Sequence, residues 1–345
     1  MKREAFHFAG EQVAAGERAT IDIPVSVLSD HTPVTLSAHV IHGKRPGPTV
    51  FVSAAIHGDE IIGVEIIRRL IRTPQLRSIA GTLICVPVVN AFGFITHSRY
   101  LPDRRDLNRS FPGGPTGSLA ARLADLFMTE VVARCDAGVD LHSAAQNRIN
   151  LPQIRVDAGL PRARELAEAF GAPVIVQSDL REGSLRAAAQ ELGKPVLVYE
   201  SGEALRFDET ALRMGVKGVL RVLAEMGMIR KTKQLSLKRP SEFSKKSSWS
   251  RAPMGGVLRM HRMIGDHVSK GELIATLGDP LGEKQLELTA PIDGLIIGRI
   301  MLPIVNEGDA VCHIASISSP DLPQSMEQLE SDFTGDPLFD EDEII

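Results

Sequence analysis

The segment His57-Gly58-Asp59-Glu60 holds the residue types that a metal site needs. It lies where a short apolar run, residues 49–56, gives way to a segment with apolar residues at helical spacing. The imidazole of His57 and the carboxylate of Glu60 would converge there, and catalytic zinc typically takes three N/O ligands and keeps a fourth position for water. The alternative is that Asp59 and Glu60 only complement the positive end of a helix. A third ligand is needed to decide.

A second strand-like segment, residues 138–142, offers that third ligand. Asp140 and His142 share one face of it by the two-residue period of a strand. His142 at the strand's end can meet the His57 site, and Asp140 can orient a ligand from behind. The competing histidines are more typical of surface or satisfied core positions, and they are His39, His42, His97, His261, His267 and His313.

A further carboxylate, Glu200, ends the apolar run of residues 195–200. Val196, Val198 and Glu200 share one face, so the carboxylate falls at a strand's carboxyl end, where ligands of open α/β sheets gather. A glutamate beside zinc can serve as general base toward water. Glu203, three residues on in the turn, is the rival, and spacing alone favours Glu200 only modestly.

Residues 98–113 form a loop that is rich in arginine and has neither helical nor strand period. The planar fork of arginine suits bidentate recognition of carboxylates. For Arg104 and Arg105, surface ion pairs are the preferred interpretation. The loop is a candidate for carboxylate recognition.

The elements that must position these residues alternate between strands and helices. After an antiparallel strand pair within residues 11–43, apolar strands are predicted at 49–56, 81–90, 138–142, 173–177 and 195–200. Helices are predicted from about 60, over 118–134, and near 161–170, 182–192 and 208–227. This alternation predicts an α/β domain with a mainly parallel sheet and right-handed crossovers.

The C-terminal third differs in character. Residues 229–251 are basic, Ser-rich and without a core-facing period, which predicts a solvated linker. Short β segments separated by Gly- and Pro-containing turns then predict a small all-β unit. From Asp321 onward nine acidic side chains and no Lys or Arg predict a disordered or loosely docked tail. The predicted domains are a catalytic domain with its N-terminal strand pair (1–235), a basic linker (236–251), an all-β domain (252–316) and an acidic tail (317–345).

Composition excludes several classes of protein. The net charge of -4, without a concentrated basic footprint, gives no reason to expect nucleic-acid binding. Three scattered cysteines build neither a disulfide framework nor a Cys-based zinc site. The N-terminus has no apolar signal region, and no window approaches the roughly 20 apolar residues of a membrane helix. We expect a soluble, cytoplasmic protein without a membrane partner.

Taken together, HGDE, SRY…DLNRSFPG, DLHS and YESGE resemble the succinylglutamate desuccinylase/aspartoacylase family, which is related to the zinc carboxypeptidases. The motifs follow in the right order through the whole α/β domain. The resemblance implies a carboxypeptidase-like mixed sheet flanked by helices. It also implies hydrolysis of the amide bond of an N-acyl amino acid, which releases a carboxylic acid and a free amino acid.

The resemblance also implies roles for individual residues. Zn²⁺ would be bound by His57, Glu60 and His142, Glu200 would be general base and later acid, Arg99 would polarise the scissile carbonyl and stabilise the oxyanion, and Asn108 and Arg109 would hold a substrate carboxylate. The loop between Arg99 and Asn108 is longer than in aspartoacylase itself, so the placement of Arg99 follows less directly than that of the ligands.

The small all-β unit resembles the barrel-sandwich fold of biotinyl and lipoyl carrier domains. Those carriers present a modified lysine after Met or Asp in a tight hairpin, and Lys284 lacks that dipeptide. Two-domain bacterial members of the family, of the N-acetyl-diaminobutyrate deacetylase type, carry such a unit after the catalytic domain, and the chain resembles them. The rival functions are a metallocarboxypeptidase and a non-catalytic binding or carrier protein. Whether the chain forms a homo-oligomer stays open.

Overall fold

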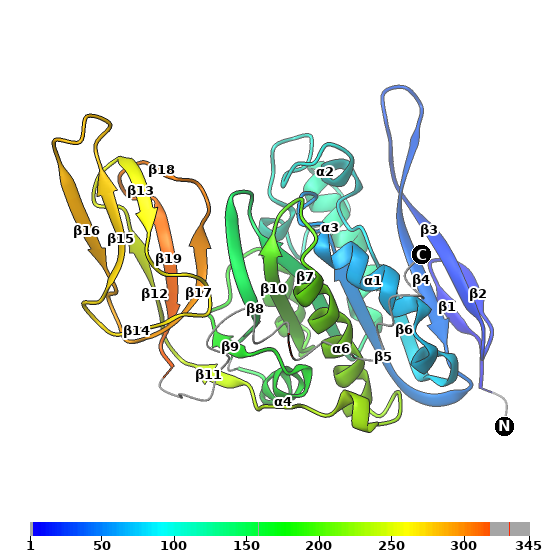
Figure 1. The fold of residues 1–345 in the computed structure, drawn as a ribbon. Coiled ribbons are helices and arrows are strands. Elements are labelled where there is room, and N and C mark those ends of the chain that lie inside the picture. Colours follow the sequence, from blue (N-terminus) through cyan, green and yellow to red (C-terminus); the bar gives the residue numbers. More distant parts are fainter. Residues whose placement is uncertain (1–2, 158, 318–330, 332–345) are drawn as a thin grey trace.

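The centre of the molecule is a 13-stranded mixed sheet, seen in a computed structural model that describes residues 3–157, 159–317 and 331 (Figure 1). Four of its strands are parallel neighbours in the order β10-β7-β5-β6. Their bounds are β5 (Arg45–Ala54), β6 (Ala80–Val86), β7 (Ala137–Ala144) and β10 (Val196–Glu203). The predicted mainly parallel core is confirmed, and its carboxyl ends form one edge on which side chains can converge.

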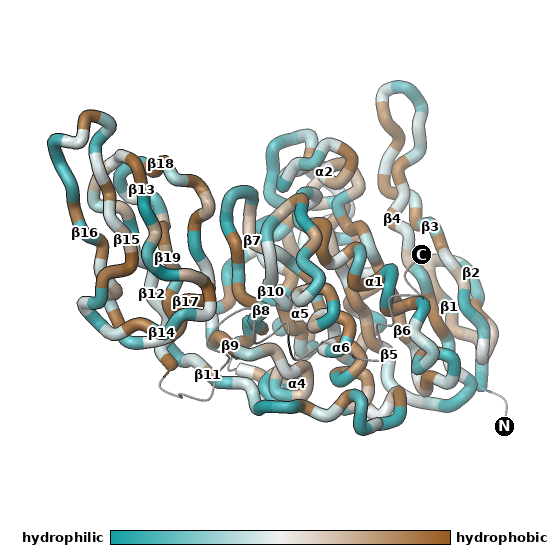
Figure 2. Tube along the Cα trace, viewed as in Figure 1, coloured by the Kyte–Doolittle hydropathy of each residue, from teal (hydrophilic) through white to brown (hydrophobic). Residues whose placement is uncertain are grey.

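Helices cover both faces of this core. One apolar cluster joins α1 (Ile62–Arg72), α4 (Pro161–Phe170) and α6 (Glu209–Glu225) to one face. A second cluster joins α3 (Leu119–Glu130) and α5 (Leu185–Glu191) to the other. Both β6 and β7 are buried along their whole length. The sequence of β6 is accordingly a nearly continuous apolar run, whereas β7 also carries the polar residues Asp140, His142 and Ser143. Figure 2 shows the apolar colouring gathered along these inner strands.

The N-terminal segment adds antiparallel strands at the far edge of the sheet. As predicted, two long strands form a hairpin, and this hairpin pairs through β4 with β6. The bounds are β1 (Phe6–Phe8), β2 (Glu11–Val13), β3 (Arg18–Val27) and β4 (Pro33–His42). The hairpin tip extends away from the rest of the molecule in Figure 1.

The strands β12 to β19, called the β unit below, lie at the opposite edge of the sheet. Three of them continue the central sheet in the order β12-β19-β17, and β17 pairs antiparallel with β8. The rest form a four-stranded sheet of order β16-β15-β13-β18, while β14 pairs with β17. The bounds are β8 (Arg148–Val156), β12 (Ser247–Arg251), β13 (Gly256–Met260), β14 (His267–Val268), β15 (Leu273–Gly278), β16 (Gln285–Thr289), β17 (Gly294–Ile300), β18 (Ile304–Val305) and β19 (Ala310–Ala315). The predicted all-β architecture of this part is confirmed.

Three local predictions differ from the structure. The strand β8 was not predicted, because its polar side chains and central Pro152 hide the strand period. The segment predicted as a solvated linker contains β11 (Glu242–Ser244), which pairs with β9, and β12, which pairs with β19. Glu60 lies before α1 rather than in its first turn, since that helix begins at Ile62. The prediction of an acidic tail falls almost entirely outside the described residues.

The remaining elements are short connections. They are β9 (Val174–Gln177), α2 (Ala91–Ile95) and the 3₁₀ turns Pro74–Ser78, Leu107–Arg109, Val132–Arg134 and Lys233–Leu235. Among the described residues, no helix has the length and apolar character to cross a membrane.

Candidate active site

The three residues predicted as metal ligands meet at the carboxyl ends of β5 and β7. Their candidate ligand atoms, on His57, Glu60 and His142, all lie within 4.8 Å of one another. The three residues are 4%, 2% and 3% exposed. His57 follows β5, Glu60 lies in the turn before α1, and His142 lies within β7. The described part of the chain holds no second cluster of this kind.

Glu60 faces both imidazoles with its two oxygens. Oε1 lies 2.7 Å from Nδ1 of His57, and Oε2 lies 2.7 Å from Nδ1 of His142. The contact with His142 is a hydrogen bond, but the one with His57 is not aligned as one. Nδ1 of His57 is therefore a buried polar atom without a hydrogen-bond partner among the described residues, which is rare in folded proteins. A cation between the three donors would satisfy it, so the donor set fits a zinc ion.

The second nitrogen of each imidazole is held by an aspartate. Nε2 of His142 lies 2.7 Å from Oδ2 of Asp140, whose Oδ1 accepts a hydrogen bond from Ser53 at 2.8 Å. Nε2 of His57 lies 3.1 Å from Oδ1 of Asp106. Such carboxylate–histidine pairs fix the ring so that its other nitrogen points at the metal. Sequence reasoning anticipated Asp140 but gave no role to Asp106, which belongs to the arginine-rich loop.

The charges of the site favour a bound cation. Burial alone would lower the pKa of His142, but the carboxylates of Asp140 and Glu60 outweigh it and raise that pKa well above its usual value. Burial would raise the pKa of Glu60, yet the imidazoles of His57 and His142 hold it well below its usual value. The protein therefore gathers ionised carboxylates around a buried point, which is the environment of a metal centre.

Two glycines allow the turn that carries the ligands. A Cβ at Gly58 would lie 1.9 Å from the carbonyl carbon of Gly93, so only glycine lets this turn pack against α2. A Cβ at Gly63 would lie 2.6 Å from Cβ of Ala54 and 2.7 Å from Cβ of Leu141. The first turn of α1 thus rests directly on β5 and β7, which fixes Glu60 between the two histidines.

Arg99, predicted to face the oxyanion, reaches the candidate metal centre. Its Nη1 donates to Oε1 of Glu60 at 3.0 Å, and its Nη2 donates to Oδ2 of Asp106 at 3.0 Å. Asn108 and Arg109 line the same cavity. The Oδ1 of Asn108 already accepts the backbone N–H of Leu185 at 2.9 Å, so only its amide nitrogen is left for a ligand.

Glu200 lies beside the candidate metal centre, whereas Glu203 does not. Glu200 pairs in register with His142 on the parallel strand β7, and it lines the cavity. Its Oε2 accepts a hydrogen bond from Asn150 at 3.0 Å. Oε1 of Glu203 instead accepts the backbone N–H of Asn147 at 2.9 Å, and Glu203 is not among the residues of the cavity wall. The structure therefore favours Glu200 as the carboxylate with access to a ligand.

The cavity has a volume of about 260 Å³ and a strongly cationic wall. Four acidic residues line it, against seven arginines, which are Arg99, Arg109, Arg148, Arg155, Arg181, Arg186 and Arg299. Burial, and then the neighbouring Arg155, lowers the pKa of Arg186 to about 10. Nε of Arg155, Nη1 of Arg186 and Oγ of Ser178 lack hydrogen-bond partners among the described residues. These three residues were not predicted from the sequence, because β8, the loop after β9 and α5 showed no motif.

The β unit supplies part of the wall through Trp249 and Arg299. The Trp249 ring stacks on His313 with centroids 4.3 Å apart and planes 6° apart. The guanidinium of Arg148, from β8, lies 5.9 Å from the centre of the Trp249 ring. Trp249 falls in the segment predicted as a linker, so no local pattern indicated this role.

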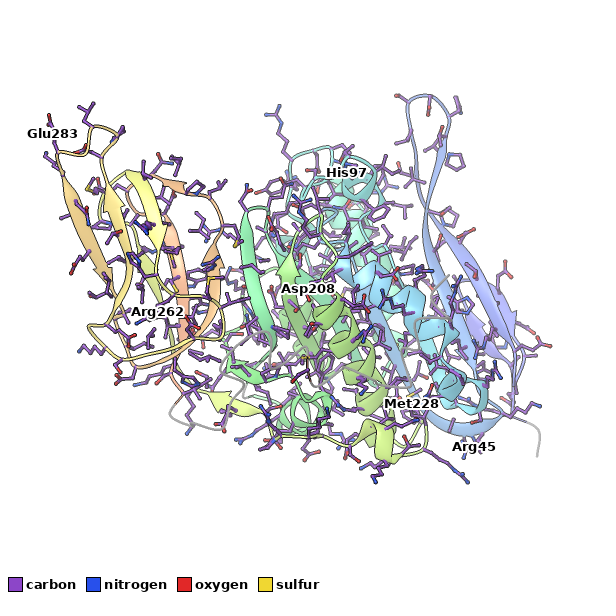
Figure 3. The ribbon with its side chains drawn as sticks, viewed as in Figure 1. Arg45, His97, Asp208, Met228, Arg262 and Glu283 are labelled. Carbon is purple, nitrogen blue, oxygen red and sulfur yellow. The ribbon has the colours of Figure 1, made fainter. Side chains whose placement is uncertain are left out.

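The competing histidines lie elsewhere. His97 lies beyond α2 at the surface of the catalytic part (Figure 3). His39 contacts Thr20 in the N-terminal hairpin, and His42 contacts Thr82. The tip of the β15–β16 hairpin, where Figure 3 labels Glu283, lies far from the catalytic part, so Lys284 has no place in the cavity wall.

The fold and the site together define an α/β protein with a candidate metal centre at the carboxyl edge of its parallel strands. The family model of the succinylglutamate desuccinylase/aspartoacylase catalytic domain matches residues 46–226. An N-alpha-acetyl-L-2,4-diaminobutyric acid deacetylase of Halomonas elongata is 30% identical over 290 residues, which are 79% of this chain and 84% of the relative.

Solved structures agree with the sequence comparison. The product-bound ectoine utilization protein EutE (DoeB) of Ruegeria pomeroyi aligns with a TM-score of 0.79 and 25% identity, over 92% of this chain and 96% of that one. A succinylglutamate desuccinylase/aspartoacylase of Rhodobacter sphaeroides aligns with a TM-score of 0.80 and 25% identity, over 92% and 97%. This chain belongs to the succinylglutamate desuccinylase/aspartoacylase family and is an amidohydrolase.

Proposed function

We propose that the chain is a zinc-dependent deacylase that cleaves the amide bond of an N-acyl amino acid. The observation that carries the proposal is the meeting of two kinds of group in one cavity. The buried donors His57, Glu60 and His142 lie there beside Glu200, a carboxylate open to the cavity, and Arg99, a guanidinium at the centre itself. This combination suits metal-assisted hydrolysis, and the family consists of deacylating hydrolases.

The chain's own residues can carry the proton transfers. A zinc ion held by His57, Glu60 and His142 would supply Lewis-acid chemistry, polarising an amide carbonyl and making water more acidic. Glu200 takes the proton of the attacking water as general base and returns it to the leaving amine as general acid. Arg99, fixed by Glu60 and Asp106, holds a positive charge where the carbonyl oxygen becomes negative.

The cationic wall supports a substrate with carboxylate groups. Arg109, the amide nitrogen of Asn108, Arg155 and Arg186 all line the cavity. The atoms of Arg155 and Arg186 that lack a hydrogen bond would gain charge-assisted hydrogen bonds from an anion. N-acyl amino acids carry at least one carboxylate. The Halomonas elongata relative deacetylates N-acetyl-diaminobutyrate, so that compound belongs in the test beside N-acyl derivatives of acidic amino acids.

A substrate panel with zinc-loaded enzyme tests the proposed activity. The panel holds N-acetyl-diaminobutyrate, N-acetylaspartate, N-succinylglutamate and a dipeptide with a free carboxyl end. We expect the highest kcat/KM with one of the N-acyl amino acids and weak cleavage of the dipeptide. A dipeptide cleaved best would instead make the chain a metallocarboxypeptidase.

Elemental analysis tests the proposed ligands. His142→Ala should lose the bound zinc, and Asp140→Asn should lower zinc affinity by about 10–100-fold, because the ring of His142 loses its anchor. His97→Ala is the matched control, since His97 lies outside the cluster, and it should keep its metal. Undiminished zinc in His142→Ala would remove that residue from the centre.

A further inference from the structure

We propose that Asn150 is a positioning residue for Glu200, and that the β unit holds Asn150 in place through Gly298. The inference rests on the proposed role of Glu200. The β unit would then take part in the reaction, because its strand β17 orients Asn150 and thereby the carboxylate of Glu200.

The side chains of Asn150 and Glu200 are in direct contact. Nδ2 of Asn150 donates to Oε2 of Glu200 at 3.0 Å. Glu200 also forms a long ion pair with Arg155, whose Nε lies 3.6 Å from Oε1, beyond hydrogen-bond distance. Asn150 is 7% exposed, so its amide has little freedom to turn toward solvent. Asn150 therefore fixes the carboxylate in the orientation that faces the cavity.

Asn150 lies between two neighbouring strands, β10 and β17. On one side Asn150 pairs with Gly202 of β10, two residues after Glu200. On the other side it pairs with Gly298 of β17. Both partners are glycines. The side chain of Asn150 is therefore the only one at this position across the three strands.

The side-chain amide of Asn150 packs closely against Gly298. A Cβ at Gly298 would lie 2.9 Å from Oδ1 of Asn150, closer than carbon and oxygen atoms normally approach. Gly298 does not have a positive φ, so the backbone does not require glycine there. The missing side chain instead makes room for Oδ1, and with Oδ1 on this side Nδ2 points at Glu200.

Hydrogen bonds on both sides of Asn150 attach the β unit to β8. The backbone N–H of Met301 donates to the carbonyl of Asn147 at 2.8 Å, and Nε2 of Gln153 donates to the carbonyl of Ile297 at 3.2 Å. Nη1 of Arg148 donates to the carbonyl of Ala310 on β19 at 2.8 Å. These bonds bracket the Asn150–Gly298 pair, so the β unit keeps a fixed distance from the Asn150 amide.

Loss of the Asn150 donor has a defined consequence. Glu200 would then be held only by its existing ion pair with Arg155, and the carboxylate could close the 3.6 Å gap to Nε, which takes it away from the attacking water. Arg155 is one of the proposed substrate-binding groups, but Arg109, Arg186 and the amide nitrogen of Asn108 stay free to bind the substrate. The turnover number should therefore fall by a larger factor than KM rises.

The experiment compares Asn150→Ala, Asn150→Asp, Gly298→Ala and the double variant Asn150→Ala/Gly298→Ala in the full-length, zinc-loaded chain. Asparagine and aspartate share one shape, but aspartate has no N–H to donate to Glu200. Gly278→Ala is the matched control, because a Cβ there lies 3.7 Å from its nearest neighbour, in the same β unit. Zinc content, the melting temperature and the fluorescence of Trp249, the single tryptophan of the chain, report an intact fold and a docked β unit.

We expect Asn150→Ala to lower kcat by about 10–100-fold, the cost of one hydrogen bond to a charged group, with a smaller change in KM. Asn150→Asp should fall at least as far despite its matching shape, Gly298→Ala should lower kcat, and Gly278→Ala should match wild type. Because Gly298→Ala acts through Oδ1 of Asn150, it should cost nothing further in the Asn150→Ala background.

Several results would overturn the proposal. They are wild-type kcat in Asn150→Ala, full activity in Asn150→Asp, or additive losses in the double variant. Each is read beside Glu200→Gln. An inactive Glu200→Gln with an active Asn150→Ala refutes only the positioning role, whereas an active Glu200→Gln refutes the proposed general base itself.

Discussion

At the scale of single residues, the site separates carboxylates that look alike in the sequence. Glu200 and Glu203 are three positions apart, yet one faces the cavity and the other caps a backbone N–H. A residue's chemistry here depends on what its atoms contact: Glu200 keeps one oxygen without a hydrogen bond, and Glu203 is committed to Asn147.

Glu200→Gln should keep zinc and fold but lose turnover by about 10²–10⁴-fold, since an amide cannot take the water's proton. Glu203→Gln is the matched control and should stay active, because an amide oxygen can still accept the N–H of Asn147. Steady-state kinetics with zinc content measured in each variant checks this. A dead Glu203→Gln beside an active Glu200→Gln would reverse the assignment.

Arg99 and Arg109 should differ in kinetic signature. If Arg109 holds a carboxylate that persists through the reaction, Arg109→Ala should raise KM more than it lowers kcat. If Arg99 faces the developing oxyanion, Arg99→Ala should lower kcat and kcat/KM together. Arg109→Lys should rescue poorly, because a point charge cannot make the two-pronged contact. Equal profiles for the two alanine variants would contradict this division.

At the scale of elements, the site depends on how closely α1 approaches the sheet. The helix begins two residues after Glu60, and Gly63 lets its first turn lie directly on Ala54 and Leu141. Any displacement of α1 would move the carboxylate of Glu60 away from the two histidines.

Gly63→Ala should destabilise the protein, although alanine is the better helix former. Helix propensity would contribute roughly 1 kcal/mol in its favour. The added methyl group would lie 2.6 Å from Cβ of Ala54, and overpacking of this kind typically costs about 1–3 kcal/mol. We expect a lower urea midpoint and weaker zinc binding. Gly278→Ala, with room for its Cβ, is the control, and equal midpoints for both variants would contradict the packing argument.

At the scale of the whole molecule, one sheet runs from the N-terminal hairpin through the catalytic core into the β unit (Figure 1). The stack of Trp249 on His313 lies at this junction, and Trp249 lines the cavity. Burial, and then Arg155, lowers the pKa of His313 to about 3. His313 therefore stays neutral in the folded protein under conditions that protonate it in the unfolded chain.

The sign of the resulting pH dependence follows from linkage. Between the unfolded pKa of about 6.5 and the folded pKa of about 3, the unfolded state binds the extra proton. This contribution to stability is fully present above pH 6.5 and is lost as the pH falls through that window. His313→Gln should reduce the slope of unfolding free energy against pH by up to about 1.4 kcal/mol per pH unit. Urea unfolding followed by Trp249 fluorescence checks this, and parallel slopes would contradict it.

Local sequence patterns were enough to predict part of the protein. β5 and β6 contain nearly continuous apolar runs, and β7 contains a short alternation of apolar and polar residues, so all three could be recognised as strands. The ligands next to them followed from their positions at strand ends. Asp140 could be placed behind His142 because strands alternate their faces with a period of two.

The rest of the site could not be predicted from local patterns, because it depends on contacts between distant segments of the chain. Asp106 contacts His57, which is 49 positions away in the sequence, and Asn150 contacts Glu200, which is 50 positions away. No local sequence period predicts either contact. The strand β8 is polar because it lines the cavity, and the same polarity conceals it from a search for apolar periodicity. Trp249 enters the site only because β17 pairs with β8 and brings the β unit to the cavity. Strand residues that line a ligand cavity are polar, so such strands lack the apolar pattern by which strands are recognised in a sequence. The positions of these residues are then determined by strand pairing across the sheet.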